Sequence, residues 1–217
     1  MGIVHFINRV LDRISKRVID PVLAGKRRKK LKSTDFTIIS NNCWGGVVYE
    51  YFGLPKQSPT VGAYFFASDY VKFCSNLHYY LGLNLELITA DDSHNKEALY
   101  KKNQQGAIIG KIDDVEIVFL HYHNKKELLE KWERRKKRVN WDKIILKFSF
   151  QNDCSDELVR SFMKIPAYKK ICFVGGEVEG CPDVLYYPRH NDKKETVDET
   201  YNLGRWFNIV DLINNVL

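Results

Sequence analysis

The sequence lacks the paired cysteines that would indicate a zinc-binding or a disulfide-rich protein. Its five cysteines are an odd number, and none falls in a CxxC pair. This spacing argues against a zinc site and against a disulfide framework. A reducing cytoplasm is therefore the simplest environment for the chain.

Long apolar runs and targeting signals are also lacking. The first residues, MGIVHFINRV, reach Asn8 and Arg9 too early for the core of a signal peptide, and no later run approaches the length of a membrane span. The initial Met-Gly is followed by Phe6 rather than by Ser or Thr at that position, so it gives no support for myristoylation. We therefore expect a cytoplasmic protein without a membrane-spanning segment.

The part of the chain expected to form the fold carries almost no net charge, although the whole chain has a formal net charge of +7. Residues 1–32 hold ten Lys or Arg against two acids, which leaves 24 basic and 25 acidic residues for the other 185. A nucleic-acid-binding domain would carry a basic face on the fold itself. The distribution of charge therefore argues against nucleic acid as a partner.

The basic excess lies in an N-terminal arm, residues 1–32, that has a helical pattern. Apolar residues recur at three- and four-residue steps from Ile3 to Val18, with Arg and Lys between them. Pro21 and Gly25 then interrupt the pattern, and the run KRRKKLK follows. One interpretation is a peripheral anchor, whose apolar stripe enters the lipid interface while the basic run binds anionic headgroups. The other is an amphipathic helix that packs on its own domain and is followed by a solvated linker.

Residues 33–217 alternate between strand and helix patterns, which predicts a single α/β domain. The expected strands are 36–39, 85–88, 107–110, 115–121, 144–150 and 171–174. The expected helices are 44–52, 68–81, 125–139, 156–164 and 207–217, and residues 91–106 read as an exposed loop with at most one turn of helix. Strands and helices of these lengths indicate right-handed crossovers. We therefore expect a Rossmann-like fold, with a mostly parallel or mixed sheet and helices on both faces, plus the N-terminal amphipathic helix.

The stretch Asp35 to Gly46, DFTIISNNCWGG, contains the clearest candidate site. A buried strand ends in the polar run Ser40-Asn41-Asn42-Cys43, and a pair of glycines then opens a helix. Such a turn presents small polar side chains and unpaired backbone N–H groups at a helix N-terminus, where negative charge is favoured.

Three other expected strand ends are polar or rich in glycine. They are His121-Tyr122-His123-Asn124, Gln151-Asn152-Asp153-Cys154 and Gly175-Gly176. The ends of parallel strands meet along the edge where open α/β folds bind ligands. We therefore expect these segments to lie near Cys43.

Cys43 and a histidine form a candidate catalytic pair. A thiol at the start of a helix is activated when a neutral His121 or His123 within reach accepts its proton. The next three backbone N–H groups would then hold an oxyanion, and they belong to Trp44, Gly45 and Gly46. This arrangement suits acyl transfer. The alternative is that Cys43 is a small buried apolar residue and His121 a hydrogen-bonded histidine at a strand end.

Two other types of site remain open. In the first, Cys43 is inert and the glycines of the turn bind phosphate, although they form no Walker or dinucleotide fingerprint. The base would be Asp153 or Glu177, and the phosphate partners would be Arg134, Arg135 or Arg138. In the second, Asp91 and Asp92 resemble the acidic pair that holds a metal in many sugar-nucleotide transferases, but no third ligand accompanies them. We expect no metal site.

Four motifs occur in the order found in one bacterial family. They are FTIISNNCWGG, LPKQSPTVG with the later SDYVKF, IGKIDDVEIVFLHYHNKKELLEKWERRKKRVNW, and YKKICFVGG. Over residues 35–210 the chain thereby resembles the family called domain of unknown function 1919. Members of this family are often named exopolysaccharide or capsule biosynthesis proteins, and some are labelled acetyltransferases. The resemblance implies a pathway and supplies no catalytic residues.

Together, the residues and the resemblance imply a protein of surface-polysaccharide assembly that transfers an acyl group, acetyl from acetyl-CoA, to a sugar hydroxyl. The acceptor would be lipid-linked or polymeric, residues 1–32 would contact the inner face of the plasma membrane, and no cofactor would stay bound. Ser40 is the alternative nucleophile or polar anchor. The expected substrate contacts are Asn41, Asn42, Trp44, Gly45, Gly46, Asn152, Asp153, Gly175 and Gly176. The alternatives are a glycosyl- or phospho-sugar transferase and a non-catalytic subunit that docks an enzyme to the membrane.

Overall fold

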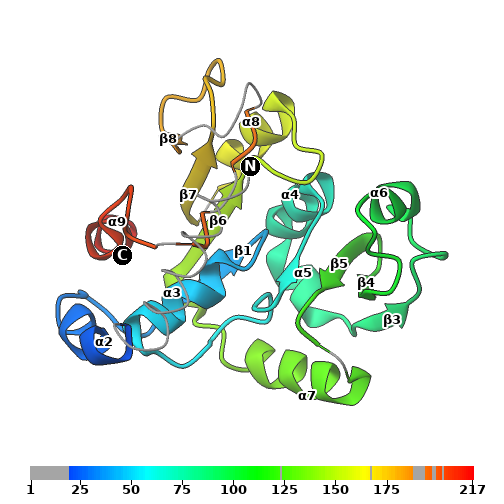
Figure 1. Cartoon of the computed structure of the whole chain (residues 1–217), viewed down its shortest axis with the longest axis horizontal. Coiled ribbons are helices and arrows are strands. Elements are labelled where there is room, and N and C mark those ends of the chain that lie inside the picture. Colours follow the sequence, from blue (N-terminus) through cyan, green and yellow to red (C-terminus); the bar gives the residue numbers. More distant parts are fainter. Residues whose placement is uncertain (1–19, 123, 167, 188–193, 197–198, 202) are drawn as a thin grey trace, which may run out of the picture.

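The strands of the protein form two separate sheets in a computed structural model that describes residues 20–122, 124–166, 168–187, 194–196, 199–201 and 203–217 (Figure 1). The first sheet is parallel, in the order β1 (Thr37–Ser40), β6 (Ile144–Ser149), β7 (Lys169–Val174), β8 (Leu185–Tyr186). The second is antiparallel, in the order β2 (Ala63–Tyr64), β5 (Val115–Phe119), β4 (Ile108–Ile112), β3 (Glu86–Ile88). The α/β class is confirmed, but the antiparallel strands form a sheet of their own instead of joining the parallel one.

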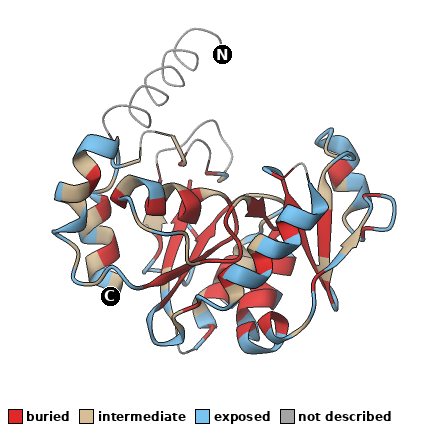
Figure 2. Ribbon diagram, turned by 90° about the horizontal axis from the view of Figure 1, so that it is seen from below, coloured by how far each residue is buried: buried red, intermediate tan, exposed pale blue. Residues whose placement is uncertain are grey.

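Helices cover both faces of the parallel sheet, as expected. Alternate side chains, such as Leu146 and Phe148, enter a core with α4 (Ala67–Ser75) and α8 (Asp156–Lys164). The residues between them, such as Ile145, enter a core with α3 (Trp44–Phe52) and α9 (Ile209–Val216). Every residue of β1 and β6 is buried (Figure 2), which is typical of parallel strands covered on both faces.

Most expected elements are present close to their expected bounds, and Ser155 caps α8 by accepting a hydrogen bond from Leu158 N at 3.3 Å. The expected helix over 68–81 is wrong in one respect, because it is divided into α4 and α5 (Leu77–Gly82). The break is at Asn76, whose φ of −141° is not helical. Asparagine disfavours helix interiors because its side chain competes for backbone hydrogen bonds. The first of the two helices also begins at Ala67, one residue before the expected start.

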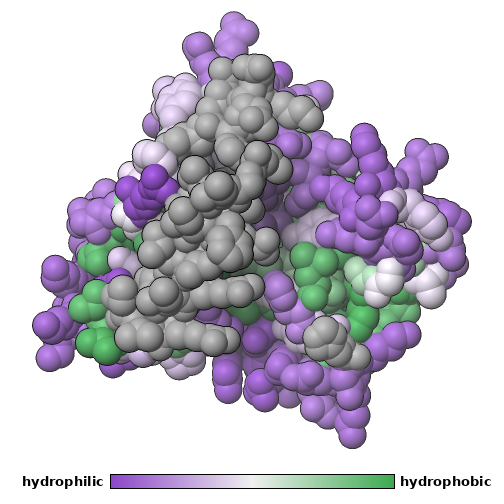
Figure 3. All heavy atoms as spheres, in the orientation of Figure 1, coloured by the Kyte–Doolittle hydropathy of each residue, from purple (hydrophilic) through white to green (hydrophobic). Residues whose placement is uncertain are grey.

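Two charged segments differ in detail from expectation. Residues within the expected loop 91–106 form α6 (Lys96–Lys101). Helix α7 (Lys125–Lys136) ends three residues before its expected end, with Leu128 and Trp132 buried and Leu129 exposed. The surface over α7, at the lower right of Figure 3, is hydrophilic, so this helix packs by a narrow apolar stripe.

The described part of the expected arm is a helix that packs on the domain. Helix α2 (Asp20–Arg28) runs through Pro21, which we expected to interrupt a helix. Within the described residues the helix continues past both Pro21 and Gly25 without a break. Arg28 Nη1 donates to Gly53 O at 2.9 Å, at the end of α3. The remaining amphipathic pattern, residues 1–19, lies outside the described residues. Within the described ones, no helix has the length and apolar character needed to cross a membrane.

Helix α4 joins the two sheets. Tyr70 is fully buried, its hydroxyl donates to Ile39 O in β1 at 2.7 Å, and its ring stacks on Phe148 in β6. The adjacent Asp69 accepts a hydrogen bond from Glu116 N in β5 at 3.2 Å. The relative position of the sheets therefore depends on polar contacts from one turn of α4.

We expect Tyr70→Phe to lower the free energy of unfolding by about 1 kcal/mol, because it removes one buried hydrogen bond while keeping the ring. Tyr79→Phe is the matched control, since that hydroxyl donates to Asp113 on the exposed surface, and it should change stability much less. Urea denaturation followed by circular dichroism measures both. Equal losses would contradict the role assigned to the Tyr70 hydroxyl.

Candidate functional site

Cys43 and His121 meet where the two sheets adjoin. Cys43 directly precedes α3 at the carboxyl end of β1, and its side chain is half-buried. Its Sγ lies 3.4 Å from Nε2 of His121, an exposed residue just after β5. The structure therefore brings together the thiol and one of the two expected histidines, although they come from different sheets. The other histidine, His123, lies outside the described residues.

The segment after β2 holds the ends of the sheets in place. Phe65 N donates to Asn41 O at 3.1 Å, and Ala67 N donates to Asn152 O at 2.9 Å. The side chain of Asn152 in turn donates to Phe65 O at 3.1 Å. Asn152 has a φ of +55°, a left-handed conformation that asparagine tolerates better than most residues. The turns after β1 and β6 are thus both hydrogen-bonded to the segment that links β2 to α4.

The two glycines after Cys43 allow α3 to start against β1. A Cβ atom at Gly45 would lie 3.0 Å from Ile38 Cγ2, and one at Gly46 would lie 3.1 Å from Val61 Cγ1. Of the three expected oxyanion donors, the N–H of Trp44 already donates to Asn42 Oδ1 at 3.1 Å. The N–H groups of Gly45 and Gly46 lie in the first turn, where helix geometry supplies no backbone partner.

A buried ion pair that the sequence did not reveal lies behind the turn. The side chains of Lys147, in β6, and Glu199 are 0% and 2% exposed, and they form a salt bridge. Ser149 Oγ donates to Glu199 at 2.6 Å. Burial lowers the pKa of Lys147, and the charge of Glu199 opposes this shift. A lysine inside the apolar strand IILKFS was the available signal, because such a strand is buried on both faces.

The ion pair orients Asn42. Its Oδ1 accepts hydrogen bonds from Lys147 Nζ at 3.1 Å and from Ser40 Oγ at 3.2 Å, as well as from Trp44 N. Its Nδ2 donates to Glu199 and, at 3.0 Å, to Gln151 Oε1. Both the oxygen and the nitrogen of the Asn42 side chain, directly before Cys43, are therefore held by hydrogen bonds.

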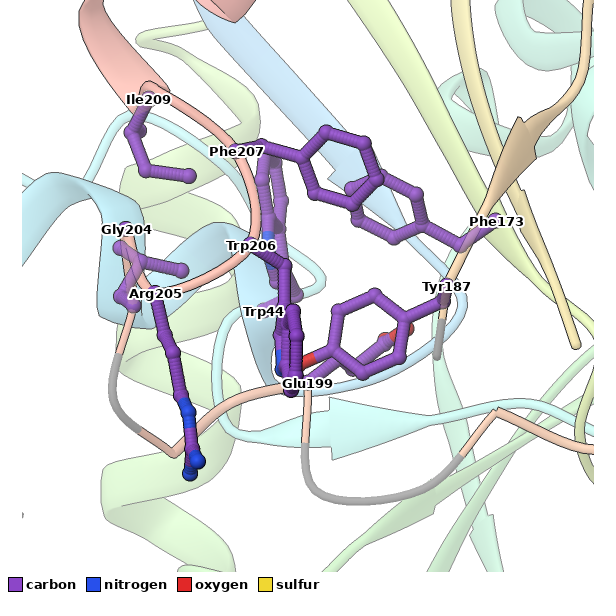
Figure 4. Close-up of a pocket in the computed structure, with 10 residues that line it drawn as sticks. Trp44, Phe173, Tyr187, Glu199, Gly204, Arg205, Trp206, Phe207 and Ile209 are labelled. Carbon is purple, nitrogen blue, oxygen red and sulfur yellow. The ribbon is translucent and has the colours of Figure 1, made fainter. Parts of the chain in front are cut away.

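Aromatic rings enclose Glu199 (Figure 4). Trp44 lies edge-on to Phe173 with 5.7 Å between ring centroids, and Phe207 stacks on Phe173 at 5.2 Å. Lys147 Nζ lies 5.2 Å from the centroid of Phe173. The space left among these residues is about 10 Å³, room for no more than one water molecule. The aromatic cluster therefore surrounds the ion pair, and the space within it is too small for a substrate.

Two larger pockets share Cys43. The first, here the amide pocket, has a volume of about 230 Å³. Besides Cys43, its polar lining includes Asn42, Tyr64, Lys102, Gln104, Gln151 and Asn152. The second, here the cationic pocket, has a volume of about 350 Å³. Its lining includes Cys43, Glu50, Lys56, His121, Tyr122, Lys131 and Arg135. A group bound at Cys43 would therefore be reached from two chemically different sides.

Other expected site residues lie apart from these pockets or have structural partners. Asn41 is fully buried and exchanges two hydrogen bonds with the backbone of Ser149. Gly175 N donates to Lys194 O at 2.9 Å, and a Cβ atom at Gly176 would lie 3.1 Å from the Lys194 side chain. Gly175, Gly176 and Asp153 are not among the described residues that line either pocket.

The residues of the two other expected sites also differ in position. Arg135 is buried and lines the cationic pocket, whereas Arg134, Arg138 and Glu177 are exposed. Asp91 pairs with Lys96 at 2.8 Å, and Asp92 accepts from Thr89 Oγ1 at 2.7 Å. The described parts of the chain contain no group of three His, Cys, Asp or Glu residues arranged to hold a metal ion.

Comparison with known proteins finds similarity along nearly the whole chain. A model of the family described as domain of unknown function (DUF1919) matches residues 14–216. An uncharacterized protein of Haemophilus influenzae is 25% identical over 201 residues, which cover 93% of this chain and 83% of that protein. The similarity spans both sheets and all of the residues around Cys43.

We expect Lys147→Met and Glu199→Gln each to destabilise the protein by about 3–5 kcal/mol, because each leaves a buried charge without its partner. The double variant should lose less than the sum of the two single losses, and urea denaturation of all four proteins measures the difference.

The exposed pair of Lys72 and Asp114, with 2.9 Å between Nζ and Oδ2, supplies the matched control. Its cycle, with Lys72→Met and Asp114→Asn, should give almost no coupling because water screens both charges. Additive losses at Lys147 and Glu199 would show that the buried pair does not act as a unit.

Proposed function

Because this chain belongs to the family described as domain of unknown function (DUF1919), a description that names no activity, we propose its function from the site itself. Cys43 and His121 act as the catalytic pair of an acyltransferase that esterifies a sugar hydroxyl. The observation that carries the proposal is the 3.4 Å distance between Cys43 Sγ and His121 Nε2 at the junction of two pockets.

In the first half of the reaction, His121 accepts the thiol proton and Cys43 attacks the carbonyl carbon of a thioester donor. The N–H groups of Gly45 and Gly46, at the positive end of α3, stabilise the negative charge that develops on the carbonyl oxygen. The bond from the acyl carbon to the donor sulfur then breaks. The donor leaves as a thiol with the proton held by His121, and the acyl group stays on Cys43.

In the second half, the acceptor hydroxyl gives its proton to His121 and attacks the acyl-cysteine. The carbon–sulfur bond to Cys43 breaks, the sugar ester forms, and the proton returns from His121 to the thiolate. The enzyme ends in its starting state. This order of steps needs donor and acceptor to reach Cys43 in turn, which suits a thiol that lines two pockets.

The lining of the amide pocket supports a sugar as the acceptor. Its carboxamides each carry donors and acceptors, and so match hydroxyl groups, which also donate and accept. Gln104, Gln151 and Asn152 supply these groups. In our proposal the donor is acetyl-CoA and the acceptor is a lipid-linked or polymeric sugar of surface-polysaccharide assembly. Residues 1–32 would hold the protein at the inner face of the plasma membrane.

One observation favours a second candidate, a glycosyl- or phospho-sugar transferase. The cationic pocket next to Cys43 suits the diphosphate of a nucleotide sugar as well as that of acetyl-CoA. In that case Cys43 would be dispensable. A non-catalytic docking subunit would tolerate the loss of both Cys43 and His121.

Incubation of the full chain with acetyl-CoA should place one acetyl group on Cys43, detectable by peptide mass spectrometry. Cys43→Ala should abolish the modification, and His121→Asn should slow it by about 10²–10⁴-fold because the general base is lost. Cys154→Ala is the matched control. Cys154 is also half-buried, but burial raises its pKa to about 12, so it stays a thiol.

Acetylation that persists in Cys43→Ala would overturn the assignment of the nucleophile. Transfer of a sugar from a nucleotide sugar by the same variant would replace acyl transfer with the second candidate.

A further inference from the structure

Arg135 is a buried cation without a carboxylate partner among the described residues. It is 8% exposed, and its Nη1 donates to Val61 O at 3.1 Å and to Tyr122 Oη at 2.5 Å. Both of these acceptors are neutral. Buried charges in proteins are normally paired or neutralised, because leaving water without a counter-ion is costly.

Lys147, the buried cation on the other side of Cys43, illustrates the usual arrangement. Its ammonium is paired with Glu199 inside the fold. Arg135 instead lines a pocket of about 350 Å³. The structure therefore leaves room at Arg135 for a counter-ion that none of the described carboxylates supplies.

Two further cations line the same pocket. Lys56 pairs with Glu50 at 2.6 Å, and Lys131 pairs with Glu127 at 2.5 Å while its Nζ lies 5.5 Å from the centroid of Tyr122. All four charged side chains of these pairs are about one-third to one-half exposed, and such pairs are weak because water screens them. A multiply charged anion can compete with them, whereas it could not displace Glu199 from Lys147.

We propose that the cationic pocket binds a phosphate or diphosphate group of the donor through Arg135, Lys131 and Lys56. Guanidinium groups match phosphate oxygens in geometry as well as in charge. Because Cys43 and His121 line the same pocket, the reactive end of such a donor reaches the thiol from this side. The acceptor then occupies the amide pocket. That the bound molecule is a donor rests on the proposed function, whereas binding of the phosphate group itself does not.

Isothermal titration of the full chain with inorganic pyrophosphate tests the proposal. Binding should be measurable in the unsubstituted protein and in Cys43→Ala, and it should weaken as salt concentration rises. Lys131→Gln should raise the dissociation constant at least about tenfold, since a charge-assisted hydrogen bond is lost. The double change Lys56→Gln with Lys131→Gln should raise it further.

Arg134→Gln is the matched control, because it removes the same charge from the same helix at an exposed position. It should leave the dissociation constant unchanged. Arg135→Gln should abolish binding, and its melting temperature without ligand shows whether the fold is intact. An equal effect of Arg134→Gln and Lys131→Gln, or no binding of pyrophosphate to the unsubstituted protein, would overturn the proposal.

Titrations with coenzyme A and with uridine diphosphate distinguish the two sources of the diphosphate. Binding of either ligand supports the anion site if Lys131→Gln weakens that binding. The ligand with the lower dissociation constant identifies the class of donor. Acetylation of Cys43 without any binding of pyrophosphate would leave the proposed function standing and overturn the anion site. Pyrophosphate binding that depends on Lys131, without acetylation of Cys43, would support the anion site and overturn the proposed function.

Discussion

The ammonium group of Lys147 lies inside a sheet that is covered on both faces, and the need to pair that charge determines the architecture of the site. Its partner, Glu199, lies 52 residues further along the chain, beyond the last strand of that sheet. The same ammonium orients Asn42, whose Oδ1 also accepts from Trp44 N at the start of α3. The position of Cys43 thus depends on a contact between the middle and the end of the chain.

Local signals predicted the parallel core well, because its elements are specified by nearby residues. The apolar runs of β1 and β6, the glycines of α3 and the Ser155 cap of α8 each act within a few positions of the chain. The division of the strands into two sheets depends instead on which strands meet in space. The two-residue connection between β4 and β5, in which Asp113 has a φ of +54°, is typical of an antiparallel pair. It did not indicate that this pair would stay separate from the parallel sheet.

The site was predictable to a similar extent. Polar residues at strand ends identified Cys43 and His121, which the structure brings together, but could not reveal that β5 belongs to the second sheet. Glu199 lies in a segment without periodicity, so only the structure shows its contact with Lys147. The burial of Arg135 could have been predicted from its position on α7, although a charged residue suggests exposure. Arg135 follows the buried Leu128 and Trp132 at helical spacing on α7, which places it on the inner face, whereas Arg134 lies on the outer one.

The insertion of the antiparallel sheet between β1 and β6 also constrains the order in which the molecule can assemble. Among the described strands β1 pairs with β6 alone, and Thr37 meets Ile144 roughly 100 residues further along the chain. Synthesis proceeds from the N-terminus, so β1 leaves the ribosome well before its partner exists. The hairpin of β4 and β5 needs only local contacts and forms early, since contacts close in sequence form fastest. We infer that β1 stays an unpaired apolar segment until β6 has been synthesised. The turn that contains Cys43 reaches its final form only after Glu199 has also been synthesised.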